Sequence, residues 1–190
     1  MKTLYLLRHG ETICNRERRF YGSLESELTD QGRKQARQQR KLMESFEPEV
    51  IYTSGLKRAQ ETATIAFPKR ELLKRDVFNE KGFGLWEGLT ADEIEDRDPV
   101  NWVRWLEAPF DYCPPQAESF SDFKTRVQSG LVEILAREEA TIVLVAHLGV
   151  LRLLIQNLTD PHRSFWDIEV PQGRVLVLEE SLVGWREKLL

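Results

Sequence analysis

The sequence predicts an α/β fold: a three-layer α/β/α sandwich in which a mostly parallel central sheet carries helices on both faces. Two observations predict it. Short apolar runs typical of buried strands alternate with longer segments of helical periodicity, as in sheets covered by helices. The run Thr141–Ala146 is apolar on both faces, which is typical of a central parallel strand. The chain has 190 residues, 41% of them hydrophobic, and this fits one domain with a buried core.

The N-terminal half contains three expected strands and two expected helices. The strands are at residues 2–7, 50–52 and about 71–75. The helices are at about 29–46 and 56–66. Thr29 and Ser54 are polar residues placed to cap the two helices, and Pro48 and Pro68 follow their ends. In the first helix the apolar face is formed by Ala36, Met43 and Phe46.

The C-terminal half continues the alternation. We expect a helix over about 90–106 that is interrupted near Pro99, then an irregular stretch over 108–117 with three prolines. Ser119 or Ser121 opens a strongly periodic helix. The strand 141–146, a helix over 150–158 and a last strand over 174–178 follow. We expect residues 1–190 to form one domain, with about 80–117 inserted over the active site.

Composition excludes several classes of function. The net charge of −4 argues against a nucleic-acid-binding surface, which would be basic. No apolar run approaches the roughly 20 residues that span a bilayer, and the N-terminus does not resemble a signal peptide. Cys14 and Cys113 have neither metal-site nor disulfide spacing, so we expect two free thiols in a cytoplasmic protein. An edge strand and exposed tryptophans would permit a homodimer without requiring one.

Two of the chain's three histidines stand where expected strands end. Arg8-His9-Gly10 follows the first strand, and His147 follows the strand 141–146, with Gly149 two places on. In open α/β sheets, ligands bind at the carboxyl ends of strands. Glycine lets a ligand approach the backbone, and a helix N-terminus after His147 favours an anion. A single histidine here can simply bond a carbonyl, but two together indicate an anion site.

Arg58 lies in the first turn of a helix that follows another strand. It can be a solvated surface residue, but its position is again the carboxyl end of a strand. Arg8 and Arg58 together can hold the oxygens of a phosphate in bidentate fashion. A histidine that attacks a phosphate must be neutral, and two neighbouring guanidinium groups penalise an imidazolium.

A longer series of residues resembles the histidine phosphatase superfamily, in its phosphoglycerate-mutase-like branch. The matching positions run in order through nearly the whole chain. They are Leu7-Arg8-His9-Gly10-Glu11-Thr12 with Asn15, Tyr21-Gly22, Leu28-Thr29, Gly32, Gln35-Ala36, Ser54-Gly55-Leu56-Lys57-Arg58-Ala59, Thr62-Ala63, Glu80, Phe83-Gly84, Trp86-Glu87-Gly88 and Ala146-His147.

The resemblance implies a role for each matching site residue. His9 is the nucleophile that takes the phosphoryl group, and Glu80 protonates the leaving alcohol and then assists water. The rest of the phosphate pocket is Arg8, Arg58 and His147. Further substrate or phosphate contacts are implied at Asn15, Tyr21, Gly22 and Leu148. The resemblance implies no metal and no cofactor, and a small phosphorylated metabolite as the partner.

The same resemblance favours transfer of the phosphoryl group to water over its transfer back to a sugar acid. Cofactor-dependent mutases of the superfamily are longer, with insertions and a tail over the site, and 190 residues leave no room for both. Several segments resemble the α-ribazole phosphatases, namely Arg19-Phe20-Tyr21-Gly22, Glu118-Ser119-Phe120, His147-Leu148-Gly149-Val150-Leu151, and Phe165-Trp166 with the turn Val170-Pro171-Gln172-Gly173. Leu148 replaces the first of two usual glycines, and Gln116-Ala117 replaces another pair before Glu118.

The expected reaction is therefore dephosphorylation of α-ribazole 5′-phosphate, in cobalamin synthesis, through a phosphohistidine. A broad-specificity or sugar-phosphate phosphatase and a phosphoglycerate mutase are the alternatives. A non-enzymatic phosphate-binding module is disfavoured because all five catalytic positions are filled. Four aromatic residues of the insertion can form a stacking wall for an aromatic base or pack the insertion onto the sheet, namely Trp102, Trp105, Phe110 and Tyr112. For Trp102 and Trp105, which share a helical face, we favour packing.

Overall fold

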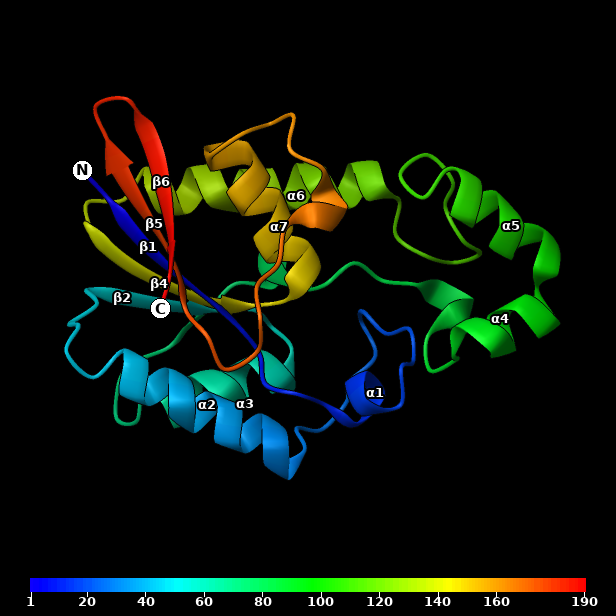
Figure 1. Ribbon diagram of the computed structural model, residues 1–190, viewed down its shortest axis with the longest axis horizontal. Coiled ribbons are helices and arrows are strands. Elements are labelled where there is room, and N and C mark those ends of the chain that lie inside the picture. Colours follow the sequence, from blue (N-terminus) through cyan, green and yellow to red (C-terminus); the bar gives the residue numbers. More distant parts are fainter.

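The computed structural model describes residues 1–190 and contains one six-stranded sheet in the order β3-β2-β4-β1-β5-β6 (Figure 1). The strands are β1 Thr3–Arg8, β2 Val50–Thr53, β3 Leu73–Lys74, β4 Thr141–Ala146, β5 Leu176–Ser181 and β6 Gly184–Leu189. β1 to β4 are mutually parallel where they pair, whereas β5 runs antiparallel to β1 and to β6. The predicted fold class is confirmed.

Helices cover both faces of this sheet (Figure 1). They are α1 Ile13–Arg16, α2 Asp30–Leu42, α3 Lys57–Ala66, α4 Ala91–Arg97, α5 Pro99–Glu107, α6 Phe120–Leu135 and α7 Leu148–Leu158. Short 3₁₀ turns are η1 Asp76–Phe78, η2 Gly84–Trp86 and η3 Phe165–Asp167. No helix combines the length and the apolar character that crossing a membrane requires.

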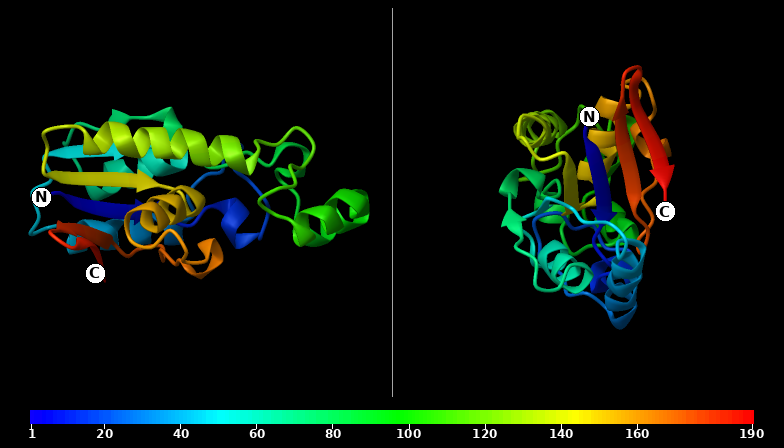
Figure 2. Two further views of the ribbon diagram at one scale, coloured as in Figure 1. Left: turned by 90° about the horizontal axis from the view of Figure 1, so that it is seen from above. Right: turned by 90° about the vertical axis from the view of Figure 1, so that its left-hand side faces the viewer.

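Alternate residues of each strand enter two separate cores, as the period of two in a strand dictates. Leu4 and Leu6 of β1 pack into the larger core with α6 and α7. Tyr5 and Leu7 of the same strand face the opposite core, where the small residues of α3 allow close packing. Figure 2 shows the resulting layers from two further directions. Because both faces are buried, β1 and β4 hold fixed positions at the centre of the sheet.

Several predicted boundaries differ from the structure. Ser54 does not cap α3: the N-cap is Leu56, without a side-chain bond, because the Ser54 hydroxyl contacts His147 instead. Phe46 lies beyond the end of α2 but still packs on Tyr5. Among the two serines proposed to open α6, Ser119 is the N-cap. The expected break near Pro99 is confirmed, since this residue begins α5.

The last strand was misplaced and another was missed. β5 covers Leu176–Ser181 rather than 174–178, and it continues through a tight turn into the edge strand β6. Most β6 side chains are exposed, and polar and charged residues dominate it, so no apolar pattern marks it as a strand. The four-residue α1 was also missed, although Thr12 and Asn15 form a capping box around it.

The segment between η2 and α6 projects beyond the carboxyl ends of the parallel strands (Figures 1 and 2). It has its own small core of Trp86, Ile94 and Trp102. Phe20, from the loop after α1, packs edge-on against Trp86 and Trp102 and so fastens the segment to the N-terminal loop. This arrangement leaves a hollow between the projecting helices and the sheet.

Candidate active site

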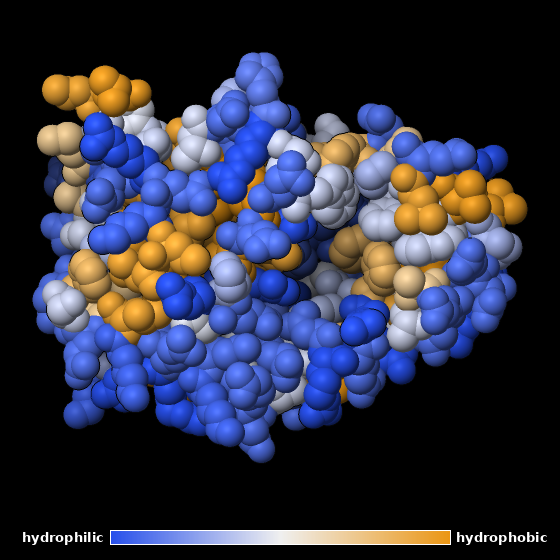
Figure 3. All heavy atoms as spheres, in the orientation of Figure 1, coloured by the Kyte–Doolittle hydropathy of each residue, from blue (hydrophilic) through white to orange (hydrophobic).

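A cavity of about 390 Å³ lies at the carboxyl ends of β1 and β4, between the sheet and the projecting segment. Figure 3 shows the surface hollowed between these two parts of the molecule. Seven of the nine predicted site residues line the cavity: Arg8, His9, Asn15, Tyr21, Arg58, Glu80 and Leu148. The other two, Gly22 and His147, lie directly behind this lining.

His9 is held with one ring nitrogen free. Its Nδ1 lies 2.7 Å from the carbonyl oxygen of Gly10, so Nδ1–H donates and Nε2 keeps its lone pair. The side chain is buried, at 4% exposure. Burial, followed by the charges of Arg58 and Arg8, holds the pKa of His9 well below its ordinary value. The neutral state that the sequence required is thus maintained mainly by burial, with the two arginines adding to it.

Arg58 is a buried cation that the backbone holds in place. Its Nη2 donates to the carbonyl of Gly22 at 2.6 Å, and its Nη1 donates to that of Leu24 at 2.9 Å. The Nε–H groups of Arg58 and Arg8 have no partner in the protein, although both are buried. A phosphate oxygen between them would satisfy donors that otherwise stay unpaired at a cost.

His147 is oriented by Ser54, for which the sequence suggested a helix cap and a family match but no role in the site. The Ser54 Oγ lies 2.7 Å from His147 Nε2 and accepts the N–H of Leu56 at 3.3 Å. Ser54 is fully buried, and its hydroxyl proton has no acceptor other than His147 Nε2. The hydroxyl therefore donates, which places the ring proton of His147 on Nδ1. That Nδ1 has no partner in the protein.

His147 is also neutral. Its side chain is fully buried, and its ring centroid lies 5.1 Å from that of His9. Burial, followed by the charge of Arg58, holds the pKa of His147 well below its ordinary value. A neutral ring with Nδ1–H is a hydrogen-bond donor toward an anion bound at His9.

The first prediction concerns Ser54. Ser54→Ala is expected to lower kcat/KM about 10- to 100-fold, because His147 loses the bond that fixes its tautomer. Ser54→Thr, which keeps a hydroxyl, is expected to recover part of the loss. Thr64→Ala removes an exposed hydroxyl of α3 that bonds only its own helix, and is the matched control. Steady-state rates and the inhibition constant of inorganic phosphate test this, and equal rates for Ser54→Ala and the control would contradict it.

The second prediction concerns acid stability. Both buried histidines have a lowered pKa in the folded state, so below about pH 6.5 the unfolded chain binds protons that the folded chain excludes. The free energy of unfolding therefore rises with pH here and falls on acidification. Each histidine contributes a slope of up to about 1.4 kcal/mol per pH unit. The free energy of unfolding, measured with urea at pH 5.5 and 6.5, should differ less between the two pH values for His147→Asn than for the unmodified protein. An equal difference would refute a lowered pKa for His147.

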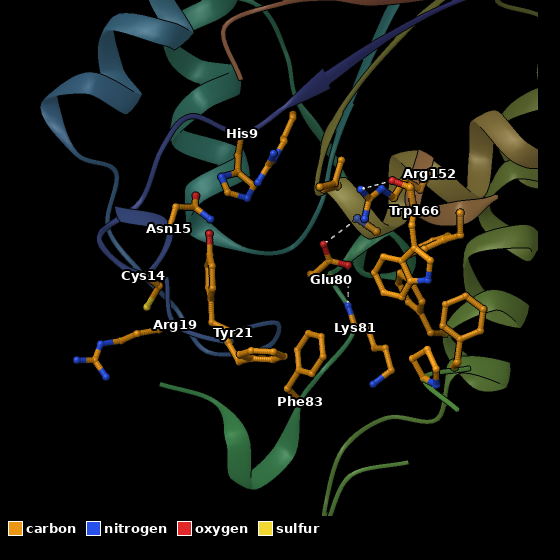
Figure 4. Close-up of a pocket in the computed structure, with 18 of the residues that line it drawn as sticks. His9, Cys14, Asn15, Arg19, Tyr21, Glu80, Lys81, Phe83, Arg152 and Trp166 are labelled. Carbon is orange, nitrogen blue, oxygen red and sulfur yellow. Dashed lines mark hydrogen bonds between the residues drawn. The ribbon is translucent and has the colours of Figure 1, made fainter. Parts of the chain in front are cut away.

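Glu80 faces this pocket from the loop after η1. Its Oε2 accepts the N–H of Gly149 and its Oε1 accepts the N–H of Lys81, both at 3.0 Å. Figure 4 shows its carboxyl group between the side that carries His9 and Tyr21 and the side that carries Arg152 and Trp166. The carboxyl group is thereby fixed at the point where the polar and aromatic parts of the cavity meet.

The glycines beside the two histidines allow segments of the protein to pack closely on one another. A Cβ at Gly149 would lie 2.5 Å from Glu80 Oε1, and a Cβ at Gly10 would collide with the carbonyl of Gly32. A Cβ at Gly22 would collide in the same way with the carbonyl of Lys81. These positions need glycine because the protein packs closely on itself there. Gly22 contributes to the site through its carbonyl, which holds Arg58.

Asn15 and Tyr21 form the wall opposite Glu80 (Figure 4). The Asn15 Oδ1 accepts the N–H of Thr12 at 3.2 Å and the side-chain amide of Gln172 at 3.1 Å, so the Asn15 Nδ2 remains free to donate. The Tyr21 hydroxyl bonds Thr12 Oγ1, and the Arg58 guanidinium stacks on the Tyr21 ring at 4.6 Å. Gln172 is a positioning residue that nothing in its local pattern revealed.

Aromatic side chains line the remainder of the cavity. Of the four aromatic residues for which a wall and packing were the alternatives, Trp105 and Phe110 line the cavity. Trp102 is buried against Trp86, as the favoured packing predicts, Trp105 also stacks on Trp102, and Tyr112 bonds Asn101. Phe110 stacks on Trp166, with ring centroids 5.5 Å apart and planes at 22°. The other aromatic lining residues are Phe20, Phe83, Phe120, Phe123 and Phe165. Cys14 also lines the cavity and, like Cys113, is a free thiol.

Comparison with known families accounts for this geometry. The sequence profile of the histidine phosphatase superfamily (branch 1) matches residues 4–190. The chain belongs to the histidine phosphatase superfamily. Its recognition from the motifs is thereby confirmed, and the protein is a phosphatase with the fold of this family. Phosphatases of this superfamily that resemble the chain act on small phosphorylated substrates.

Individual histidine phosphatases are similar to this chain over most of their length. The adenosylcobalamin/alpha-ribazole phosphatase of Escherichia coli is 31% identical over 174 residues, which are 90% of this chain and 86% of that protein. The phosphoserine phosphatase 1 of Hydrogenobacter thermophilus is 33% identical over 170 residues, 87% of this chain and 81% of that protein. The crystal structure of a putative alpha-ribazole-5′-P phosphatase from Escherichia coli has a TM-score of 0.93 at 28% identity, covering 100% of this chain and 95% of that one.

Proposed function

We propose that this histidine phosphatase is a phosphomonoesterase that hydrolyses α-ribazole 5′-phosphate through a phosphohistidine on His9. The observation that carries the reaction type is the hydrogen bond of His9 Nδ1 to the Gly10 carbonyl. It leaves the lone pair of Nε2 free in a cavity that Arg8 and Arg58 also line. A nucleophile and donors for the charge of a phosphoryl group thus occur together.

In the first half-reaction, the lone pair of His9 Nε2 forms the N–P bond while the ester P–O bond breaks. The Glu80 carboxyl group gives its proton to the departing alcohol oxygen. The transferring group is stabilised by Arg8, Arg58 and the Nδ1–H of His147. The positive charge that develops on the His9 ring is stabilised by the Gly10 carbonyl, which accepts the Nδ1–H bond.

In the second half-reaction, water takes the place of the departed alcohol. Glu80, now a carboxylate, accepts a proton from this water as its oxygen forms a bond to phosphorus. The N–P bond breaks, its electron pair returns to His9 Nε2, and inorganic phosphate leaves. Glu80 is again protonated and His9 again neutral, so the cycle closes without any external reductant or oxidant.

The aromatic part of the cavity supports the proposed substrate. α-Ribazole 5′-phosphate carries its phosphate at one end and a flat aromatic base at the other. Among the lining residues, Trp105 and Phe83 both pack edge-on against Phe20, and Phe110 stacks on Trp166. Aromatic rings bind flat bases by offset or edge-to-face contact. The similarity to the Escherichia coli alpha-ribazole phosphatase supports the same substrate.

Two further proposals accompany this function. Residues 1–190 form one domain, and about 80–117 are an insertion that contributes Lys81, Phe83, Trp105 and Phe110 to the cavity. The enzyme acts in the cytoplasm, which the two free thiols support because reducing compartments keep cysteines unpaired.

The test compares kcat/KM on α-ribazole 5′-phosphate, phosphoserine, 3-phosphoglycerate and p-nitrophenyl phosphate. We expect the highest value on the first. A higher value on phosphoserine would replace the substrate while leaving the reaction type intact. Isomerisation of 3-phosphoglycerate that exceeds its hydrolysis would instead make the protein a mutase.

A further inference from the structure

Arg152 is an arginine of the cavity lining that the phosphate pocket does not use. It extends from α7, the helix that follows His147, and its side chain is half-buried. It makes no ion pair with any carboxylate of the chain, and its hydrogen-bond partners are backbone carbonyls. The charge of a partly buried cation is not fully compensated by neutral partners, because carbonyl groups stabilise it less than an anion does.

The guanidinium group of Arg152 is rigidly placed. Its Nε donates to the carbonyl of Ile168 at 2.8 Å, and its Nη2 donates to that of Trp166 at 3.2 Å. The guanidinium carbon, Cζ, lies 5.2 Å from the centroid of the Phe165 ring and 5.6 Å from that of the Trp166 ring. These contacts fix the plane of the group, and its Nη1 donates to no group of the protein. The Nη1 is therefore the part of Arg152 that is available to a ligand.

Arg152 lies on the leaving-group side of the phosphate pocket. Gly149, one turn earlier in α7, binds Glu80, and Figure 4 shows Arg152 between Glu80 and Trp166. Burial, and then the charge of Arg8, lower the pKa of Arg152, whereas Glu80 opposes this shift. Arg152 thus lines the cavity together with Glu80 and the aromatic residues, where the alcohol part of a substrate would lie.

We propose that Arg152 binds the leaving alcohol, with its Nη1 donating to an acceptor oxygen beyond the ester oxygen. This proposal rests on the proposed function, because Glu80 defines the leaving-group side. The acceptor is an oxygen atom of the alcohol: a neutral hydroxyl of a ribose, or a carboxylate of a phosphorylated hydroxy acid, which also offsets the charge of Arg152. The preferred substrates are then oxygen-bearing alcohols rather than plain alkyl or aryl phosphates.

Two pairs of substrates test this proposal and separate the two acceptors. One pair is α-ribazole 5′-phosphate and its 2′,3′-dideoxy analogue. The other is 3-phosphoglycerate and n-propyl phosphate. Removing the acceptor of a charged hydrogen-bond donor is expected to reduce kcat/KM about 10- to 100-fold. The unmodified enzyme should therefore prefer the oxygen-bearing member of at least one pair by that factor. In Arg152→Met the preference should fall to about threefold or less.

Two other variants distinguish binding from a structural role. Gln156→Ala removes a side-chain bond from α7 to the carbonyl of Arg163 in the following segment, and should lower kcat/KM for both members of a pair equally while their ratio is retained. Arg163→Met removes a surface arginine paired with Glu187 and is the matched control for charge. A ratio lost in the riboside pair identifies the ribose hydroxyls, and one lost in the other pair identifies the hydroxyl and carboxylate oxygens of the hydroxy acid. Unchanged ratios in both pairs for Arg152→Met overturn the proposal, whereas the proposed function fails separately, if hydrolysis survives His9→Ala.

Discussion

His9→Ala is expected to lower kcat for every phosphomonoester by at least about 10⁴-fold, because the cavity then holds no imidazole with a free lone pair. The only other imidazole near it, His147, is fully buried and has its Nε2 bonded to Ser54. His147 therefore cannot take over as a nucleophile. The measurement is the steady-state rate together with an acid-sensitive, alkali-stable phosphoryl label on the quenched enzyme, which should be absent in the variant.

The chain offers a matched control in its third histidine. His162 is exposed, lies after α7 and does not line the cavity, so His162→Ala should keep both the rate and the label. His9→Ala should still bind inorganic phosphate within about tenfold of the unmodified affinity, because Arg8, Arg58 and His147 all remain. A variant that retains more than about 1% of the rate, or that still acquires the label, would refute the phosphohistidine mechanism.

The strand ends that carry the site were predictable because burial on both faces leaves a clear mark in a sequence. β1 and β4 are uninterrupted apolar runs, and a polar residue directly after such a run has to lie at the sheet edge. His9, Arg58 and His147 were found in this way, and the family resemblance supplied Glu80. The edge strand β6 leaves no such mark, since most of its side chains are exposed.

The residues that hold the catalytic groups were not predictable, since they act through contacts between segments distant in the sequence. Ser54 bonds His147 across 93 positions, and Gln172 bonds Asn15 across 157. Ser54 carries the pattern of a helix cap, and only the packed structure shows that its hydroxyl is used elsewhere. The acceptor that fixes the tautomer of His9 is a backbone carbonyl, for which no side-chain pattern exists.

The second large effect is expected for Glu80→Gln, and its size should depend on the leaving group. Glutamine keeps the shape of the side chain but cannot donate an acidic proton to a departing oxygen. For α-ribazole 5′-phosphate, whose alcohol is a poor leaving group, kcat/KM is expected to fall about 10²- to 10⁴-fold. For p-nitrophenyl phosphate, whose phenolate leaves without protonation, the fall should be at least tenfold smaller.

Comparison of these two substrates separates proton donation from mere positioning. The Glu80 carboxyl group accepts N–H bonds from Gly149 and Lys81, and glutamine retains an acceptor for only one of them. If Glu80 only held α7 in place, the variant would lose the same factor on both substrates. Glu95→Gln changes an exposed carboxylate of α4 and controls for the loss of one negative charge. An equal loss on both phosphate esters would therefore remove Glu80 from the chemical step and leave it a positioning residue for Gly149.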